Sequence, residues 1–251
     1  MTDMTDMTNK ANKTTALVTG ANKGIGYEVA AGLARTGMTV LLGSRDRIRG
    51  QEAAARLRAE GGDVRPVVLD VTDPATIDAA AATLTRLDVL VNNAGIAGPM
   101  GDPPSAMSPR TVREVFETNV VGVLMVTNAM LPLLRRSPAA RIVNVSSGVG
   151  SLAHHTDPGH YMSALPPSAT YPVSKTALNS LTVQYAKELR EDGILVNAAA
   201  PGACATDLTK DLPYQVTRTA ADGAAVIIRL ATLGPDGPTG GFYDDAGIVP
   251  W

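Results

Sequence analysis

The stretch Thr19-Gly-Ala-Asn-Lys-Gly-Ile-Gly26 decides the fold, because it places a glycine-rich turn between a short apolar run, 16–19, and a helical pattern that continues to Gly37. Glycines at such a turn let the backbone approach a phosphate, and the N–H groups of the following helix favour its negative charge. The spacing differs from the commoner G-x-G-x-x-G, and a glycine-rich turn alone is also typical of a tight strand-to-helix connection. The stretch therefore predicts a β-α unit with a dinucleotide as its candidate ligand.

Outward from this turn, short apolar runs alternate along the chain with longer helical patterns. Asp73-Pro74 and Ser108-Pro109 each place a capping oxygen before a proline, as at the start of a helix. The alternation predicts an α/β fold, a doubly wound parallel sheet of the Rossmann type with helices on both faces. Such sheets bind ligands outside the carboxyl ends of their strands. The expected strands cover residues 16–19, 39–42, 67–69, 89–91, 142–145 and 194–198, and long helices are expected over 47–60, 108–134 and 174–190.

Length and composition limit the class of protein. With 251 residues, 45% of them hydrophobic, we expect a single domain over residues 14–251. Residues 1–13 start with a repeated polar triplet, which predicts a disordered tail and not a signal peptide. A net charge of -2 and a pI of about 5.9 give no sign of a nucleic-acid or anionic membrane partner. Cys204 is the single cysteine, which excludes an intrachain disulfide, and no apolar run approaches the roughly 18 residues of a membrane span. We therefore expect a cytoplasmic protein.

The end of the second expected strand points to the type of dinucleotide. It reads Gly43-Ser-Arg45, where an NAD site normally has an acid that bonds the ribose 2′-hydroxyl. A 2′-phosphate would instead attract the nearby cations Lys23, Arg45 and Arg49 and would repel a carboxylate. The alternative is three solvated surface cations. Their position beside the glycine-rich turn favours NADPH/NADP+ as the cofactor.

Two further motifs follow expected strands on the cofactor side. Asp70 comes after the third strand and could accept a hydrogen bond from an adenine amino group. The small residues of Asn92-Asn-Ala-Gly95, after the fourth strand, would line the adenosine without clashing. Each motif could also be ordinary turn chemistry, because Asn, Asp and Gly favour turns.

Tyr171-Pro-Val-Ser-Lys175 follows the fifth expected strand and opens a helix. Residues four apart share a helix face, so we expect the Lys175 ammonium near the Tyr171 phenol. A neighbouring cation favours phenolate, which predicts a Tyr171 pKa below the usual value of about 10, toward the range that acid-base catalysis needs. A Tyr-x-x-x-Lys also arises by chance. Among the other tyrosines, only Tyr214 has a basic residue four positions on, Arg218, and it does not follow a strand.

A reacting carbonyl oxygen needs a second hydrogen-bond donor. Ser146 and Ser147 end the fifth expected strand, and only one of them can face the substrate because adjacent strand residues point opposite ways. Asn119 is a polar residue on an otherwise apolar helix face. Its side chain either bonds a helix carbonyl or holds a water molecule behind Lys175.

In this order, from Thr15 to about Thr206, the motifs resemble those of the short-chain dehydrogenase/reductase family. The chain carries TGxxxGxG from Thr19, NNAG from Asn92, and the closing pattern Pro201-Gly202-x-x-x-Thr206. Each motif is weak alone, whereas the ordered set is very specific. The Asn-Lys-Gly turn and the Ser-Arg-Asp after the second strand look most like the NADPH-dependent carbonyl reductases.

The resemblance implies an enzyme that reduces a ketone or aldehyde with NADPH, with Tyr171 as the general acid. Alternatives are oxidation of an alcohol with NADP+, or a non-catalytic NADP(H)-sensing module, which would not need the reactive residues. The implied catalytic residues are Asn119, Ser147, Tyr171 and Lys175. The implied cofactor-binding residues, among which Lys175 holds the nicotinamide ribose, are Gly20, Asn22, Lys23, Gly24, Ile25, Gly26, Arg45, Arg49, Asp70, Val71, Asn93, Ala94, Gly95, Tyr171, Lys175, Pro201, Gly202, Cys204 and Thr206.

Two departures from the family pattern stand out. Ser147 and Tyr171 are 24 positions apart (171 minus 147), longer than usual, and the extra segment 151–168 contains His154, His155 and His160. Carbonyl reductases also lengthen this stretch, which there tends to cover faces that assemble tetramers, so we expect a monomer or small homo-oligomer. The histidines could form a metal site, but no acid or thiol cluster completes it, and we expect no metal. The second departure, Cys204, should weaken cofactor packing slightly.

The substrate is expected to be a small carbonyl compound, apolar or aromatic, because the residues expected to wall the pocket are mostly apolar. These residues are Leu152, Met162, Leu165, Leu208, Leu212 and Tyr214.

Overall fold

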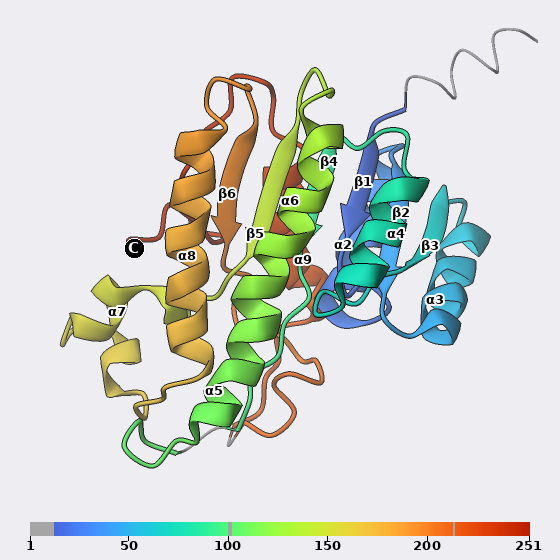
Figure 1. Ribbon diagram of the computed structural model, residues 1–251. Helices are drawn as coiled ribbons and strands as arrows, with labels where there is room; N and C mark the ends of the chain where they lie inside the picture. Colours follow the sequence, from blue (N-terminus) through green and yellow to red (C-terminus); the bar gives the residue numbers. More distant parts are fainter. Residues whose placement is uncertain (1–12, 100–101, 213) are drawn as a thin grey trace, which may run out of the picture.

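The computed structural model describes residues 13–99, 102–212 and 214–251, arranged around a seven-stranded sheet (Figure 1). The tail expected over residues 1–13 lies, except for Lys13, outside the described residues. The strands are β1 (Thr15–Val18), β2 (Thr39–Ser44), β3 (Val64–Val68), β4 (Val89–Asn92), β5 (Arg141–Val145), β6 (Leu195–Ala199) and β7 (Phe242–Tyr243). The helices are α2 (Gly24–Arg35), α3 (Arg47–Ala59), α4 (Pro74–Thr83), α5 (Pro109–Phe116), α6 (Gly122–Leu134), α7 (Leu152–Thr156), α8 (Tyr171–Glu188) and α9 (Ala220–Ala231).

The strands run in the order β3-β2-β1-β4-β5-β6-β7, and every neighbouring pair is parallel. This confirms the predicted doubly wound sheet. Strand order reverses at β1, because the chain moves outward to β2 and β3 and then returns to place β4 on the other side of β1. A crevice for a ligand is expected outside the carboxyl ends of β1 and β4.

Helices cover both faces of the sheet, as the sequence predicts (Figure 1). Ala16 and Val18 of β1 pack into a core with α2, α3 and α9, whereas Leu17 packs into the opposite core with α4, α6 and α8. Side chains of a strand alternate between faces, so a strand buried on both sides must be apolar throughout. This explains the continuous apolar runs in β1 and β4.

Some boundaries differ from the sequence-based expectation. β3 begins at Val64, earlier than expected, because Arg65 and Pro66 interrupt its apolar pattern; both are exposed on a strand that lies at the edge of the sheet. An edge strand tolerates proline and charge, since one side of its backbone needs no partner. The helix expected from 174 starts at Tyr171. Helix α9 and strand β7 were not predicted.

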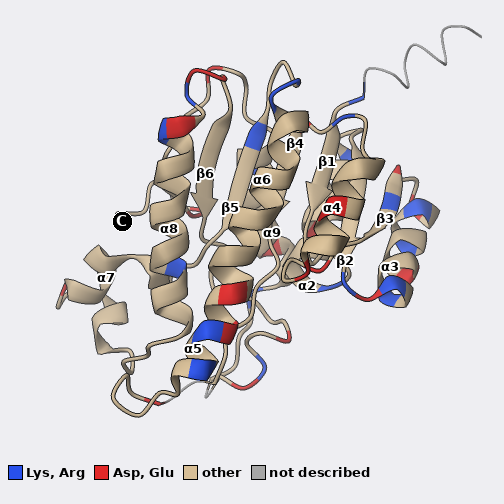
Figure 2. Cartoon of the chain, in the orientation of Figure 1, with Lys and Arg blue, Asp and Glu red and all other residues tan. Residues whose placement is uncertain are grey.

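The helix expected over 108–134 is continuous but contains a π-helical turn at Glu117–Val121 between α5 and α6. Ser108 caps its start, accepting from the Arg110 amide, as the sequence predicts. By length and composition alone, Pro109–Leu134 could span a membrane, but half of its most apolar window is buried inside the protein. Its apolar side packs against α4, α8 and β4. Charges of both signs lie on α5 and on α3 (Figure 2).

Candidate active site

A cleft of about 730 Å³ opens at the carboxyl ends of the central strands. The turn between β1 and α2 forms one end, and the start of α8 lies at the other, with the segment after β6 along one side. Sequence positions far apart thus meet where the strand order reverses. The predicted residues that line the cleft are Gly20, Asn22, Lys23, Gly24, Ile25, Gly26, Arg45, Asp70, Val71, Asn93, Ala94, Gly95, Ser147, Tyr171, Lys175, Pro201, Gly202, Cys204 and Thr206.

Some predicted residues do not line this cleft. Arg49 lies in the first turn of α3, with its Nε 3.4 Å from a carboxylate oxygen of Asp46. Asn119 lies behind the cleft wall and is fully buried. Of the apolar residues expected to wall the substrate pocket, only Leu208 lines the cleft, and the others, on 152–165 and 212–214, lie outside it.

The glycine-rich turn is shaped for a closely approaching ligand. Gly20 has a φ of 61°, in the left-handed region that favours glycine. A Cβ at Gly26 would lie only 2.4 Å from Nδ2 of Asn93, so no side chain fits there. The Thr19 hydroxyl accepts hydrogen bonds from the amides of Asn93 and Ala94, at 2.9 and 3.0 Å. These bonds tie the end of β4 to the turn and keep the cradle open for a pyrophosphate.

The three cations expected around a 2′-phosphate have different surroundings. Lys23 is ion-paired with Asp207, which comes from the segment after β6 on the other side of the cleft. Arg49 is paired with Asp46, whose carboxylate also caps α3 by accepting from the Arg49 amide. Arg45 is exposed at the cleft and has no hydrogen-bond or ion-pair partner within the described residues. Arg45 is therefore the cation whose donors are all available to a ligand.

At the other end of the cleft, the structure brings Ser147 and Tyr171 together. The Ser147 side chain lies beside the Tyr171 phenol, close enough to act on its pKa as a hydrogen-bond partner. Ser146 points the other way, into the protein, where its hydroxyl donates to the side-chain Oδ1 of Asn179 over 2.6 Å. Ser147 is thus the serine that faces the cleft, as alternation along the strand requires.

Lys175 lies beside Tyr171 but does not contact its hydroxyl. Nζ is 5.4 Å from the centre of the Tyr171 ring and donates to the Val145 carbonyl oxygen over 2.7 Å. Burial lowers the pKa of Lys175 to about 8. Burial raises the pKa of Tyr171 to about 12, although the hydrogen bond with Ser147 acts to lower it. The expected lowering of the Tyr171 pKa is therefore wrong for this arrangement, because desolvation outweighs the distant cation.

Asn119 lies in the π-helical turn, a type of helix distortion that is frequent at functional sites. Its amide group pairs with the Ile96 backbone, accepting from N and donating to O, both over 2.9 Å. It also donates to the Ser174 hydroxyl over 3.0 Å. The expected role of holding a water molecule behind Lys175 stays a prediction, and the structure contradicts only the expected bond to a helix carbonyl, which the side chain does not make. The side chain instead joins the loop after β4 to α8, one residue before Lys175.

The extra segment before Tyr171 contains α7 and a short helical turn at Tyr161–Ala164, which contact each other. Among the described residues, no group of His, Cys, Asp and Glu could hold a metal ion. His154 stacks on His160, with ring centres 3.9 Å apart, and the His155 ring nitrogen lies 3.0 Å from the Val149 carbonyl oxygen. The Ser151 hydroxyl donates to the Pro250 carbonyl oxygen over 2.6 Å. The histidines thus make structural contacts.

Sequence reasoning missed three residues that shape the site: Thr19, Ser174 and Asp207. Thr19 and Ser174 belong to the motifs described above, but no function was predicted for them, because their hydrogen-bond partners are more than 50 positions away in sequence. The Asp207 position follows Thr206 directly, and nothing local indicates that it pairs with Lys23, 184 positions away. Topology alone brings these groups together.

The residues present fit a nicotinamide dinucleotide. A glycine cradle at a helix start suits the pyrophosphate, and a cleft at the reversal of strand order has room for both halves of the molecule. At the far end, a phenol, a hydroxyl and an ammonium group surround the place where chemistry would occur. Fold and site together define a dinucleotide-dependent oxidoreductase.

Comparison with known proteins gives the family. The sequence model of the family described as short chain dehydrogenase matches residues 14–217. The chain therefore belongs to the short-chain dehydrogenase/reductase family, whose members are NAD(P)-dependent oxidoreductases acting on CH–OH groups.

Relatives cover the chain nearly completely. A protein named short-chain dehydrogenase anuI, from Penicillium roqueforti, is 37% identical over 243 residues, covering 93% of this chain and 94% of its own. Carbonyl reductase [NADPH] 1 from Rattus norvegicus is 33% identical over 280 residues, covering 95% and 99%. The crystal structure of NADPH-bound carbonyl reductase from chicken fatty liver superposes with a TM-score of 0.82, at 30% identity, covering 95% of this chain and 99% of that one.

Proposed function

We propose that this protein reduces a ketone or aldehyde to an alcohol with NADPH as the hydride donor. The observation that carries the proposal is the placing of Tyr171, Ser147 and Lys175 together at the end of the cleft away from the glycine-rich turn. The Tyr171 phenol carries its proton at neutral pH and can donate it to a carbonyl oxygen. Reduction needs a proton donor at the carbonyl oxygen, whereas oxidation needs a proton acceptor there.

In the proposed chemical step, the cofactor and the residues of this chain have separate roles. When bound, the nicotinamide supplies a hydride to the carbonyl carbon and is oxidised to its NADP+ form. Tyr171 protonates the oxygen, so that the C=O bond becomes C–H and O–H. Ser147 hydrogen-bonds the same oxygen while charge develops on it. The Lys175 ammonium, 5.4 Å from the Tyr171 ring, stabilises the phenolate left behind until solvent returns a proton.

Preference for NADPH over NADH is supported by the end of β2. No carboxylate is free to bond a ribose 2′-hydroxyl there, because Asp46 is occupied by the start of α3. Arg45 is exposed at the cleft with its donors available. Relatives that carry NADPH in their names agree with this proposal.

An apolar or aromatic substrate is the class that the surroundings of Tyr171 favour. Leu208 lines the cleft together with the apolar side chains of Ile96 and Ala97. Solved structures of similar fold include salutaridine reductase from Papaver somniferum, at 30% identity, and menthone neomenthol reductase from Mentha piperita, also at 30%.

The substitution Tyr171→Phe tests the catalytic assignment. Loss of the phenolic proton should lower kcat at least about a hundredfold for every carbonyl compound that the wild type reduces. NADPH affinity, measured by fluorescence titration, should stay within about twofold, because the ring remains in place. A Tyr171→Phe protein with wild-type turnover would overturn the assignment.

The substitution Arg45→Ala tests the choice of cofactor. Removal of a guanidinium that pairs with the 2′-phosphate should lower the ratio of kcat/KM for NADPH to that for NADH about tenfold or more. Arg49→Ala is the matched control, since Arg49 is paired with Asp46 outside the cleft, and its ratio should stay near wild type. A wild type that prefers NADH would contradict the proposal.

A further inference from the structure

Arg218 contacts the segment 201–206, which follows β6 and lines the cleft, from outside the cleft, while the Thr209 hydroxyl bonds its backbone at Cys204 and Thr206. Nε of Arg218 donates to the Pro201 carbonyl oxygen over 2.8 Å. The backbone oxygen of Arg218 accepts from the Ala205 amide, also over 2.8 Å. Both bonds are made to backbone atoms of the segment, so they constrain its path directly.

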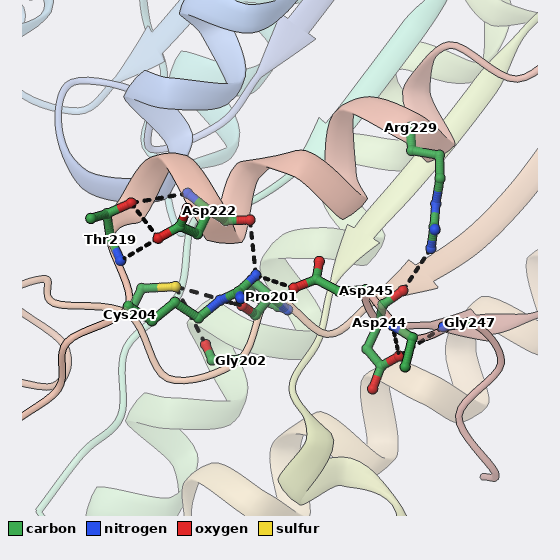
Figure 3. Close-up of polar contacts among 11 residues, drawn as sticks. Pro201, Gly202, Cys204, Thr219, Asp222, Arg229, Asp244, Asp245 and Gly247 are labelled. Carbon is green, nitrogen blue, oxygen red and sulfur yellow. Dashed lines mark hydrogen bonds and ion pairs between the residues drawn. The ribbon is translucent and has the colours of Figure 1, made fainter.

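The same guanidinium reaches two other parts of the fold. Nη2 of Arg218 donates to the Asp222 carbonyl oxygen over 2.9 Å, in the first turn of α9, and to the Asp245 carboxylate in the loop after β7. Figure 3 shows Pro201, Asp222 and Asp245 around this point. The planar fork of an arginine can donate in several directions at once, which an ammonium group cannot do with the same rigidity.

The backbone of the segment is shaped to receive this side chain. Gly202 has a φ of 75°, and a Cβ there would lie 3.3 Å from both Cδ and Nε of Arg218. The Cys204 thiol donates to the Pro201 carbonyl oxygen over 3.5 Å, on the side of α9 (Figure 3). Arg218 therefore packs closely against the peptide units at Pro201 and Gly202.

The backbone next to Arg218 is itself held in place by hydrogen bonds. The next residue, Thr219, forms a reciprocal capping box with Asp222 at the start of α9. The Thr219 hydroxyl accepts from the Asp222 amide over 3.1 Å, and the Asp222 carboxylate accepts from the Thr219 amide over 2.9 Å (Figure 3). Such a box satisfies backbone donors that the helix start would otherwise leave unpaired.

We infer that Arg218 is a positioning residue for the nicotinamide half of the cofactor. By fixing the Pro201 carbonyl and the Ala205 amide, it holds 201–206 in the conformation that lines the cleft opposite Tyr171. The inference rests on the proposed function, in which Pro201, Gly202, Cys204 and Thr206 contact the cofactor. Arg218 itself does not line the cleft and acts through the segment.

The test compares two ligands that differ only in the nicotinamide. NADPH engages the whole cleft, whereas 2′-phospho-ADP-ribose lacks the nicotinamide and engages the glycine-rich turn and the 2′-phosphate end. Arg218→Gln should raise the Kd for NADPH about tenfold, because it removes charge-assisted bonds that fix the segment. The Kd for 2′-phospho-ADP-ribose should change less than about twofold. Arg218→Lys, which keeps the charge but not the fork, should fall between wild type and Arg218→Gln.

Arg229→Gln is the matched control. Arg229 lies on α9, whose N-cap residue directly follows Arg218, and donates from Nη2 to the Asp244 carbonyl oxygen over 2.6 Å, but it makes no hydrogen bond with 201–206 within the described residues (Figure 3). This variant loses one arginine bond to the loop after β7 and should bind both ligands as the wild type does. Amide hydrogen exchange without any ligand provides a second measurement. Arg218→Gln keeps the backbone oxygen that accepts from the Ala205 amide, so faster exchange at Ala205 in this variant, and not in Arg229→Gln, would show that loss of the side chain loosens 201–206.

Two results would overturn the inference. Arg218→Gln could bind both ligands with wild-type affinity, or it could lose affinity for both equally, which would indicate general destabilisation. If the proposal of NADPH as the cofactor is wrong, the result differs from both of these. A wild type that prefers NADH contradicts the 2′-phosphate proposal, and the same comparison with NADH and ADP-ribose then tests Arg218.

Discussion

Tyr171 and Lys175 depart from their usual pKa values in opposite directions for one reason. Burial disfavours the charged form of each group, and so it raises the pKa of the phenol to about 12 and lowers that of the ammonium to about 8. Both shifts make the neutral forms easier to populate inside the cleft. Of the two residues, only Lys175 then titrates close to physiological pH.

The pH dependence of reduction should therefore follow Lys175. As pH rises through about 8, the ammonium form is lost, and with it the charge that stabilises the Tyr171 phenolate. We expect kcat/KM for reduction to be constant below this value and to fall about tenfold per pH unit above it. The measurement is a pH profile with a fixed carbonyl substrate. A profile that stays flat to pH 10 would contradict the assignment.

The sequence predicted the neighbourhood of these two side chains but not their electrostatics. Spacing along a helix shows that positions 171 and 175 share a face. It does not show that the Lys175 ammonium turns to the Val145 carbonyl oxygen, 30 positions earlier in the chain. The direction of a pKa shift depends on such distant groups and on burial, and both are known only after the fold is complete.

At the scale of elements, an exposed ion pair joins two sides of the cleft. Lys23 lies on the turn before α2, and Asp207 lies on the segment after β6. If the Lys23 ammonium also binds the 2′-phosphate of the cofactor, the Asp207 carboxylate competes with that phosphate for Lys23. Removing the carboxylate should then strengthen binding.

Asp207→Asn should lower the Kd for NADPH about two- to fivefold at low ionic strength, the range expected for an exposed pair. The effect should shrink in high salt, which screens such charges. Asp211→Asn is the control, because Asp211 lines the same cleft without an ion pair in the described part of the chain. A weaker affinity for NADPH in Asp207→Asn would show that the carboxylate supports the site.

Elements with a strong local signal were predicted, and those shaped by tertiary contacts were not. The strand ends that carry Gly20, Asn93 and Ser147 follow continuous apolar runs. The π-helical turn at Glu117–Val121 could not be predicted from the sequence, because the apolar periodicity of the helix continues on both sides of it. β7 spans only Phe242–Tyr243 and is a strand because β6 lies beside it.

At the scale of the whole molecule, a buried polar network lies at the end of the sheet opposite the cleft. Asp88, just before β4, accepts from Arg86, from the Ser137 hydroxyl and from the Thr15 amide. Burial alone would raise the pKa of Asp88, but these hydrogen bonds outweigh it and the pKa lies below its usual value. The network connects the starts of β1 and β4 with the loop before β5.

Asp88→Asn should lower Tm at pH 7 by about 5–10 °C, because a buried ionic network loses its charged acceptor. The sign of the pH dependence follows from the lowered pKa. The stabilisation is present above the unfolded-state pKa of about 4 and is lost as pH falls through the lower folded-state value. Thermal melts between pH 7 and pH 3 should show wild type and variant converge at the acid end. A constant difference would contradict this explanation.

The extra segment before Tyr171 has a consequence for how this fold can be changed. Ser147 and Tyr171 lie together at one end of the cleft although 24 positions separate them in sequence, and their places are set by the end of β5 and the start of α8. The entropy of closing a loop grows only slowly with its length, by about 0.6 kcal/mol for each doubling. The closure entropy of residues 151–168 therefore opposes changes of length only weakly. The cost of such a change comes from lost contacts, such as the Ser151–Pro250 hydrogen bond and the burial of Met162.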